Sequence, residues 1–355
     1  DNFLQALQGR VPGLIITPLN GGPGAMYLAQ IRGQNTLAST SVSKYSPLNL
    51  NQPLYLLDGQ PLAAQNTVIL DFGLNSSQVN NILQNSAGLS PLIGINPMDI
   101  ESVSILKDAD ATSIYGSQGS NGVIMITTKK GKPGVESFDL SVHTGSTVAS
   151  RTVPMMSTPQ YLAMRKEAVY NSGLQPSLAN NDADLLLFDP GKDKNYGKDF
   201  YGGMGHQTEV NAGFSGGTDR FTYLVNLGDM HESYNFPGGF ANNRFSLHSA
   251  FDRRSADKRL AISFGTDYSY DKNNSTGAPF VLYAITLPPN TPDLQDNSGR
   301  FLWDYKGYSF GGNNLYNVSA LLKQNAYTEL SFLNMHLIAD YRLLPWLKIL
   351  MAAGY

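Results

Sequence analysis

Long segments in which apolar and polar residues alternate strictly are the feature of this sequence that most constrains its fold. In the segment 244–252, Phe245 and Phe251 fall on one face, whereas Arg244 and His248 fall on the other. Successive side chains of a β-strand point to opposite faces, so this period of two predicts strands. Comparable segments lie at 138–144, 209–215, 221–227, 259–271, 331–342 and 347–355. The chain from residue 136 onward is therefore predicted to be mainly β.

Alternation of this kind fits two architectures, an antiparallel sandwich and a transmembrane barrel between lipid and a wet lumen. The longer segments run to roughly 9–13 residues, whereas an ordinary strand has about 5–6. Charged residues make up only 15% of the chain, against about 25% in soluble domains. No apolar run approaches about 18 residues, which excludes a spanning helix but leaves the barrel open. Alternation alone slightly favours the sandwich, but the strand length and the cassette that precedes these segments favour the barrel.

A compact cassette at 95–130 precedes these segments and changes structure every few residues. Asn96 before Pro97 is a helix cap followed by a proline at the first helical position. The run 103–106 predicts a strand, and Asp108 can cap the turn that follows it. Glycines between 116 and 122 predict a tight connection into a buried strand at 123–128. The cassette contains no obvious pair of nucleophile and base.

Several short motifs, taken in order, resemble the plug domain of TonB-dependent outer-membrane transporters, in particular the SusC/RagA family. They are LQALQGRVPGLIIT at 4–17, IRG at 31–33, PLYLLDGQPL at 53–62, NPMDIESVSILKDADATSIYG at 96–116 and NGVIMITTKKGK at 121–132. Weaker likeness continues at 155–168 and 214–228. Leu57 and Asp110 depart from the family's usual residues, valine or isoleucine and serine or alanine, without affecting the expected fold.

The resemblance implies a mainly β fold: a transmembrane antiparallel β-barrel with an N-terminal α+β plug domain in its lumen. The plug is expected at 1–135 and the first barrel strands at 136–355. The family's function implies active import of a nutrient oligomer, a glycan or a peptide, across the bacterial outer membrane, without enzymatic activity. Implied partners are a SusD-like surface lipoprotein lid, in a SusCD assembly that can be dimeric, the TonB–ExbB–ExbD complex and outer-membrane lipid. No cofactor is expected.

Two charged residues are candidates for holding the plug until it is pulled. Arg32 and Glu101 lie in IRG and IES, which the resemblance places near the barrel wall, and a guanidinium inside a lumen needs carboxylate partners. Plain surface charges remain the alternative. Residues expected to form the signature turns and caps of the plug are Gly33, Asp58, Gly59, Lys107, Asp108, Tyr115, Gly116 and Gly122. Substrate contacts are expected in the polar loops 38–52 and 75–92, without assignment to single residues.

The number of predicted strands is too small for a plugged barrel. About seven are found, whereas a barrel that encloses a plug needs about 22, and about eight strands leave room only for side chains. The chain is therefore expected to hold the plug and the first third of a barrel, with a TonB-contacting segment and later strands outside it. Long excursions are expected at 152–205, with a short amphipathic helix at 161–170, and at 271–325.

Two other functions are compatible with parts of this sequence, an Mg-dependent phosphatase and a signalling receptor. Asp108 and Asp110 match the DxDxT motif of Mg-dependent phosphatases, but no βαβ pattern follows to complete such a site. An outer-membrane signalling receptor of the same fold remains a second alternative. The five histidines show no metal-ligand spacing, and the glycine turn lacks the Gly-Lys-Ser/Thr ending of a phosphate loop. The net charge of −3 argues against nucleic acid as a partner.

Overall fold

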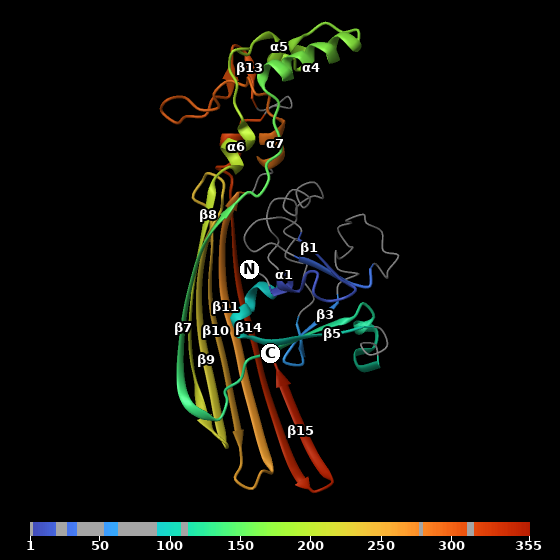
Figure 1. The fold of residues 1–355 in the computed structure, drawn as a ribbon, viewed down its shortest axis with the longest axis vertical. Helices are drawn as coiled ribbons and strands as arrows, with labels where there is room; N and C mark the ends of the chain where they lie inside the picture. Colours follow the sequence, from blue (N-terminus) through green and yellow to red (C-terminus); the bar gives the residue numbers. More distant parts are fainter. Residues whose placement is uncertain are drawn as a thin grey trace.

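The computed structural model describes residues 3–18, 27–33, 53–62, 91–107, 113–276, 280–310 and 316–355. Three parts are visible in Figure 1: a tall sheet, an N-terminal unit against one face of it, and a unit of loops at one end. The predictions for Asp108, for Asp110 and for the loops 38–52 and 75–90 concern residues outside these ranges.

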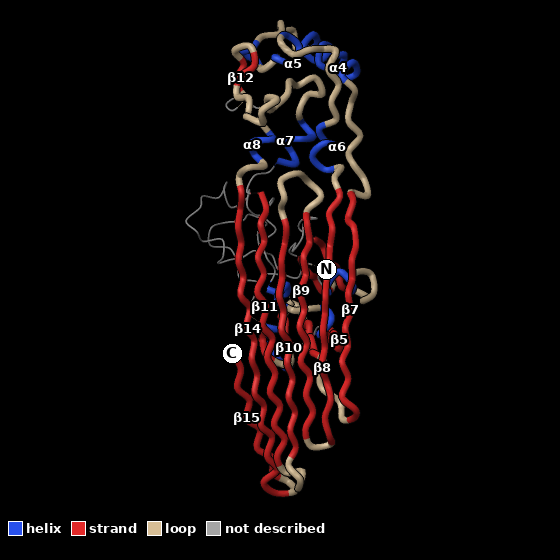
Figure 2. Tube along the Cα trace, turned by 90° about the vertical axis from the view of Figure 1, so that its left-hand side faces the viewer, coloured by secondary structure: helices blue, strands red, loops and turns tan. Residues whose placement is uncertain are grey.

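The tall sheet contains seven antiparallel strands. Each pairs with the strand before or after it in the chain, except that β11 pairs with β14 and the two short strands between them lie outside this sheet. Its strands are β7 (Gly134–Val148), β8 (Met204–Thr218), β9 (Phe221–Ser233), β10 (Ala241–Arg254), β11 (Leu260–Thr276), β14 (Asn325–Leu344) and β15 (Leu347–Gly354). All seven predicted strands are confirmed, and most are longer than predicted because the pairing runs past the alternating core of each segment. Figure 2 shows them side by side, with the short β15 along the lower part of the sheet only.

The two faces of this sheet invert the burial pattern of a soluble protein. On one face Leu227, Phe245 and Leu337 are 44%, 41% and 45% exposed. On the other, Arg244 and His248 are only 6% and 2% exposed. An apolar face of this size open to the surroundings marks a contact with another protein or with lipid, and alternation between lipid and lumen predicts this arrangement.

The N-terminal unit is a small α+β body against the polar face. Helix α1 (Phe3–Leu7) precedes the hairpin of β1 (Leu14–Pro18) and β2 (Tyr27–Ile31). A second sheet has the order β4-β3-β6-β5, built from β3 (Leu54–Leu57), β4 (Gln60–Pro61), β5 (Ile100–Leu106) and β6 (Val123–Thr128). Its core gathers buried side chains from α1, β1, β2, β3 and β6, among them Leu4, Ile16, Leu57, Ile124 and Ile126.

The structure confirms most of the elements predicted for the cassette at 95–130. The 3₁₀ turn Pro97–Asp99 is capped by Asn96, whose side chain accepts from the Met98 amide at 3.0 Å. The predicted strands 103–106 and 123–128 are β5, which begins earlier at Ile100, and β6. The glycine connection contains a 3₁₀ turn at Gly116–Gly119.

The loops between β7 and β8 and between β11 and β14 form one folded unit at the end of the sheet (Figures 1 and 2). They were expected as long excursions, and the helix predicted at 161–170 is α4 (Thr158–Asn171). That helix is less amphipathic than predicted, since Met164 and Tyr170 are 41% and 84% exposed. Side chains of α6 (Tyr196–Tyr201), α7 (Phe280–Thr286) and α8 (Val318–Leu321) share a core that includes Tyr196, Phe200, Ala284 and Val318.

Candidate functional site at the contact between the N-terminal unit and the sheet

The N-terminal unit is fastened to the sheet by side chains that reach across a large separation in sequence. Asn96 supplies the first contact: its Nδ2 donates to Asn211 Oδ1 at 2.7 Å and to Ser246 Oγ at 3.1 Å. Its Oδ1 meanwhile caps the 3₁₀ turn, so one side chain serves both the local fold and the contact. Asn96 is 5% exposed, and its bonds to the sheet are shielded from water.

Asp99 supplies the second contact from the other end of the same turn. Its Oδ1 accepts from Asn226 Nδ2 at 2.7 Å, and the carboxylate is 4% exposed. Burial raises the pKa of Asp99 above its ordinary value, while the neighbouring His248, the bond from Asn226 and the more distant Lys129 oppose that rise. At neutral pH the hydration that this buried carboxylate loses offsets part of the stabilisation that its bond from Asn226 gives to the docked state.

His248 supplies the third contact from the sheet. Its Nε2 lies 2.9 Å from the backbone oxygen of Lys129, and its Nδ1 lies 2.7 Å from Asp267 Oδ1. Both partners are acceptors, so the ring can satisfy both only as an imidazolium that donates from each nitrogen. Asn334 Nδ2 donates to the other Asp267 oxygen at 3.2 Å, which orients that carboxylate.

Two glycines leave room for the close contact between the unit and the sheet. A Cβ at Gly131 would lie 2.4 Å from the Tyr223 oxygen, closer than real atoms pack. A Cβ at Gly228 would lie 2.5 Å from both Asn96 Nδ2 and Ser246 Oγ. Glycine at position 228 is therefore required for the Asn96 contact, and glycine at position 131 for the path of the linker between β6 and β7.

An apolar contact adds to the polar ones farther along the sheet. Phe332 of β14 is half-buried against the core of the N-terminal unit. Its ring lies over Gly94, where a Cβ would come within 2.8 Å of the side chain. The unit thus spans strands from β8 to β14, joined by hydrogen bonds at one side and by packing at the other.

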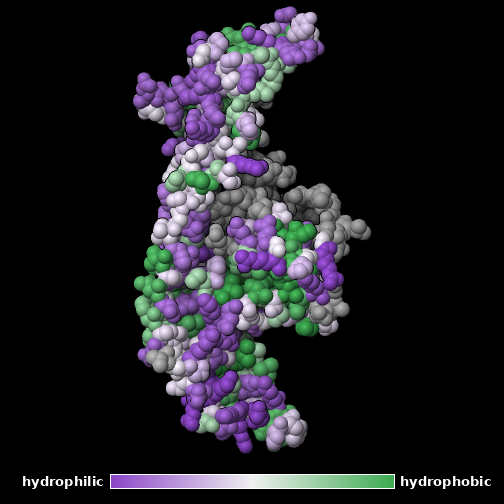
Figure 3. Space-filling view, viewed as in Figure 1, coloured by the Kyte–Doolittle hydropathy of each residue, from purple (hydrophilic) through white to green (hydrophobic). Residues whose placement is uncertain are grey.

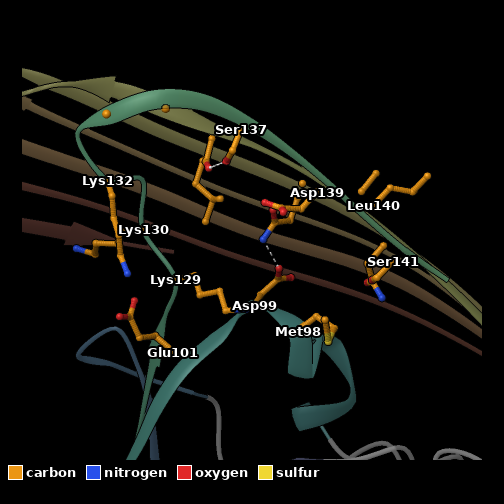
Figure 4. A pocket seen from close by; sticks show the side chains of 18 of the residues that line it. Met98, Asp99, Glu101, Lys129, Lys130, Lys132, Ser137, Asp139, Leu140 and Ser141 are labelled. Atoms are coloured by element: carbon orange, nitrogen blue, oxygen red, sulfur yellow. Dashed lines mark hydrogen bonds between the residues drawn. The ribbon is translucent and has the colours of Figure 1, made fainter. Parts of the chain in front are cut away.

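A cavity of about 700 Å³ lies between the unit and strands β7, β8 and β9. Figure 4 shows Asp99, Glu101 and Lys129 of the unit facing Ser137 and Asp139 of β7 across it. Its lining is mostly small or charged, which suits water rather than an apolar ligand. Polar contacts at the edge of a wet cavity can exchange partners with water, so they can break without a large barrier.

Arg32 and Glu101, the predicted locking pair, occupy different places. Arg32 follows β2 in the left-handed region at φ +58°, and its N–H donates to the Gly13 oxygen at 2.6 Å. Glu101 lies in β5, is exposed and lines the cavity. A locking role for either residue remains a prediction.

The predicted signature residues take up turn and packing positions. Asp58 and Gly59 have φ values of +48° and +84°, and the Asp58 carboxylate accepts from the Thr128 amide at 2.9 Å and from its hydroxyl at 2.6 Å. Lys107 Nζ donates to the Pro12 oxygen at 2.5 Å, and Tyr115 packs against the cluster of Leu56 and Val123. Gly33, Gly116 and Gly122 all have positive φ.

The residues that receive the unit on the sheet were not singled out from sequence. The sequence offered only alternation as a signal for these residues, which are Asn211, Asn226, Ser246 and Asp267. Alternation placed Ser246 and His248 on a polar face but did not identify their partners. Over the described ranges, no cluster of three or more His, Asp or Glu side chains could hold a metal ion. No helix in that same part of the chain is long and apolar enough to cross a membrane.

A family model and two curated proteins match this sequence. Residues 1–123 match the family model described as TonB-dependent receptor plug domain. TonB-dependent receptor P39 of Formosa agariphila is 32% identical over 234 residues, 65% of this chain and 18% of the relative. TonB-dependent receptor SusC of Bacteroides thetaiotaomicron is 31% identical over 272 residues, 75% of this chain and 22% of the relative.

Among solved structures, the RagAB peptide importer in its open-open state shares the fold. The superposition covers 99% of this chain and 38% of that chain, with a TM-score of 0.72 at 21% identity. The chain spans about a fifth of the length of the two curated relatives. The likeness reaches from the N-terminal unit through all seven long strands.

Proposed function

This chain belongs to the TonB-dependent receptors of the SusC/RagA type, as plug domain and early barrel strands, and we propose that its receptor imports a nutrient oligomer. Such receptors reside in the bacterial outer membrane and are not enzymes. Asp108 and Asp110 fall inside the plug match at 1–123, which argues against a phosphatase site at these residues. The long sheet is the corresponding portion of the barrel, with its polar face toward the lumen.

The observation that carries the proposal is the set of contacts from Asn96, Asp99 and Lys129 to the barrel wall. Each is a single hydrogen bond or a pair, worth about 0.5–1.5 kcal/mol net, and more where a charge takes part. Together they hold the plug in place yet can be broken one after another. This is the behaviour expected of a stopper that is pulled rather than of a fixed core.

In the proposed cycle, TonB supplies that pull from the periplasm, driven by the inner-membrane proton gradient through ExbB–ExbD. Displacement of the plug exchanges its bonds to the wall for bonds to water in the adjoining cavity. The passage that opens then lets the oligomer reach the periplasm. Arg32 and Glu101 are proposed to add charge contacts that regulate release.

A SusD-like surface lipoprotein is the proposed lid over the barrel. The folded loop unit stands at the end of the sheet away from the short turns, where a lid would sit (Figure 1). Its ordered core, joined across two loops, gives such a partner a rigid support. The cargo is proposed to be a glycan or peptide oligomer.

Growth on defined oligomers tests the proposal. In a strain that needs this receptor for one nutrient, removal of TonB should abolish growth on that nutrient while a freely diffusing monosaccharide or amino acid still supports it. Co-purification from the outer membrane should recover a lipoprotein with the receptor. Growth that persists without TonB on every dependent nutrient would exclude active import.

A further inference from the structure

A second cavity, of about 720 Å³, lies at the turn end of the barrel sheet and is strongly basic. Its walls carry six cationic side chains and two carboxylates. The cations are Arg220, Arg254, Lys258, Arg259, Arg342 and Lys348, and the acids are Asp219 and Asp340. Figure 3 shows a mostly hydrophilic surface over this end of the molecule. This cluster, here called the basic basin, contrasts with the chain's net charge of −3.

Strand register brings these cations together from three separate turns. The Arg254 amide donates to the Arg220 oxygen at 2.7 Å, and the Arg342 amide donates to the Arg259 oxygen at 2.8 Å. Arg342 and Lys348 are cross-strand partners in β14 and β15. The concentration of positive charge is thus built into the pairing of the strands.

Most of this charge is not neutralised within the described part of the chain. Lys348 pairs with Asp340, and Arg259 lies 4.0 Å from Asp257. Arg220 and Arg254 form no ion pair with any residue that the structure describes. Like charges this close repel one another, which lowers stability unless an anion is bound among them.

The basic basin faces the lumen rather than lipid. Arg254 lies six positions beyond His248 and Arg342 eight beyond Asn334, so alternation puts all four on the face that carries the plug. Pro133, in the linker from the plug to β7, also lines the basin. The exposed apolar band of the strands lies on the opposite face.

The basin adjoins the cavity under the plug. Pro133 lines both, and Lys129, Lys130 and Lys132 bring three more cations to the first cavity. Asp99, Glu101 and Asp139 line the same cavity and balance these three cations, so the excess of positive charge lies in the basin. A solute that passes beside the plug therefore meets an excess of positive charge at the basin, where six cations face two carboxylates.

From this continuity we propose that the basic basin is an exit site that selects anionic cargo, an oligomer bearing carboxylate or sulfate groups. This inference rests on the proposed import function and narrows its substrate class. A lumen-facing field of one sign concentrates the opposite charge and raises its association rate by about 10- to 1,000-fold. Neutral oligomers gain nothing from it.

Binding by the purified full-length receptor tests the proposal without TonB. The probes are oligogalacturonate and oligoglutamate, with xylo-oligosaccharide and oligoserine as their neutral counterparts. The test variant combines Arg220→Gln, Arg254→Gln and Arg259→Gln. A second variant carries lysine at the same three positions and keeps the charge. The control removes three exposed cations of the loop unit, by Arg151→Gln, Lys166→Gln and Lys323→Gln.

The association rate of at least one anionic probe should fall about tenfold or more in the glutamine variant and stay near wild type in the lysine and control variants. Raising salt from about 0.05 M to 0.5 M should abolish the difference. Binding of oligogalacturonate alone would indicate an anionic glycan as the cargo, and binding of oligoglutamate alone would indicate an anionic peptide. Equal rates for all variants, or a change confined to binding of anionic phospholipid vesicles, would overturn the proposal. Because import is not measured here, neither result decides whether transport requires TonB.

Discussion

Replacing Asn96 by serine separates its two roles, since serine also caps helical turns but cannot reach the barrel wall. The variant loses the bonds to Asn211 and Ser246, at 2.7 and 3.1 Å. At about 0.5–1.5 kcal/mol for each bond, the docked plug should be destabilised by about 1–3 kcal/mol. The Lys129 amide donates to the Asp99 oxygen, and both residues also contact the wall, through His248 and Asn226, so hydrogen exchange at this amide reports on the docked state. Its exchange should accelerate by about 5- to 150-fold.

A matched control is Asn317→Ser in the loop unit. Asn317 is also a buried cap, and its Nδ2 donates to the Leu294 and Leu302 oxygens. It should loosen the loop unit and leave the plug amides unchanged. A cycle with Ser246→Ala should show coupling to Asn96 of about 0.5–1.5 kcal/mol. Wild-type exchange at Lys129 in the Asn96→Ser receptor would refute the reasoning.

Three further changes probe other contacts. Gly131→Ala should push the linker off the Tyr223 backbone and accelerate exchange at the Lys129 amide, whereas Gly145→Ala, with open space around its Cβ, should not. Because burial raises the pKa of Asp99, the contribution of this carboxyl to docking is fully present below its ordinary pKa of 3.8 and is lost as pH rises through the raised value. The Asp99→Asn receptor should therefore lack this part of the pH dependence of hydrogen exchange. A pH profile that the substitution leaves unchanged would contradict the prediction. Arg165→Ala should destabilise the loop unit by about 3 kcal/mol and expose it to protease, because it strands two buried carboxylates, Asp182 and Asp184, that Arg165 holds at 2.7 Å.

The fold could be predicted from sequence because its signals are local. Alternation in 244–252 and its counterparts set the strands, and the Asn96-Pro97 pair set the start of a turn. Asp58-Gly59 similarly announced a hairpin, since both residues accept positive φ. In each case the residues that carry the signal are neighbours in the chain.

The contacts at the candidate site could not be predicted because they join residues 115 to 150 positions apart. Their pairing depends on which strand faces the plug and on the register of that strand, and a shift of one residue would turn Asn211 away. Arg32 and Glu101 were predicted as a locking pair because they are charged. The side chains of the wall that contact the plug are instead the amides of Asn211 and Asn226, the Ser246 hydroxyl and the His248 ring. The shared core of the β7–β8 and β11–β14 loops could not be predicted for the same reason, because its residues are far apart in sequence.

A disulfide between plug and wall tests the central claim most directly. The chain has no cysteine, so Asn96→Cys with Gly228→Cys introduces one pair, at positions where a Cβ on residue 228 would touch the Asn96 side chain. Ser137→Cys with Ser215→Cys, whose serine oxygens lie 2.9 Å apart within the wall, is the control. Oxidation should stop import of the dependent nutrient only in the first pair, and reductant should restore it. Undiminished import by the oxidised plug–wall pair would contradict the account.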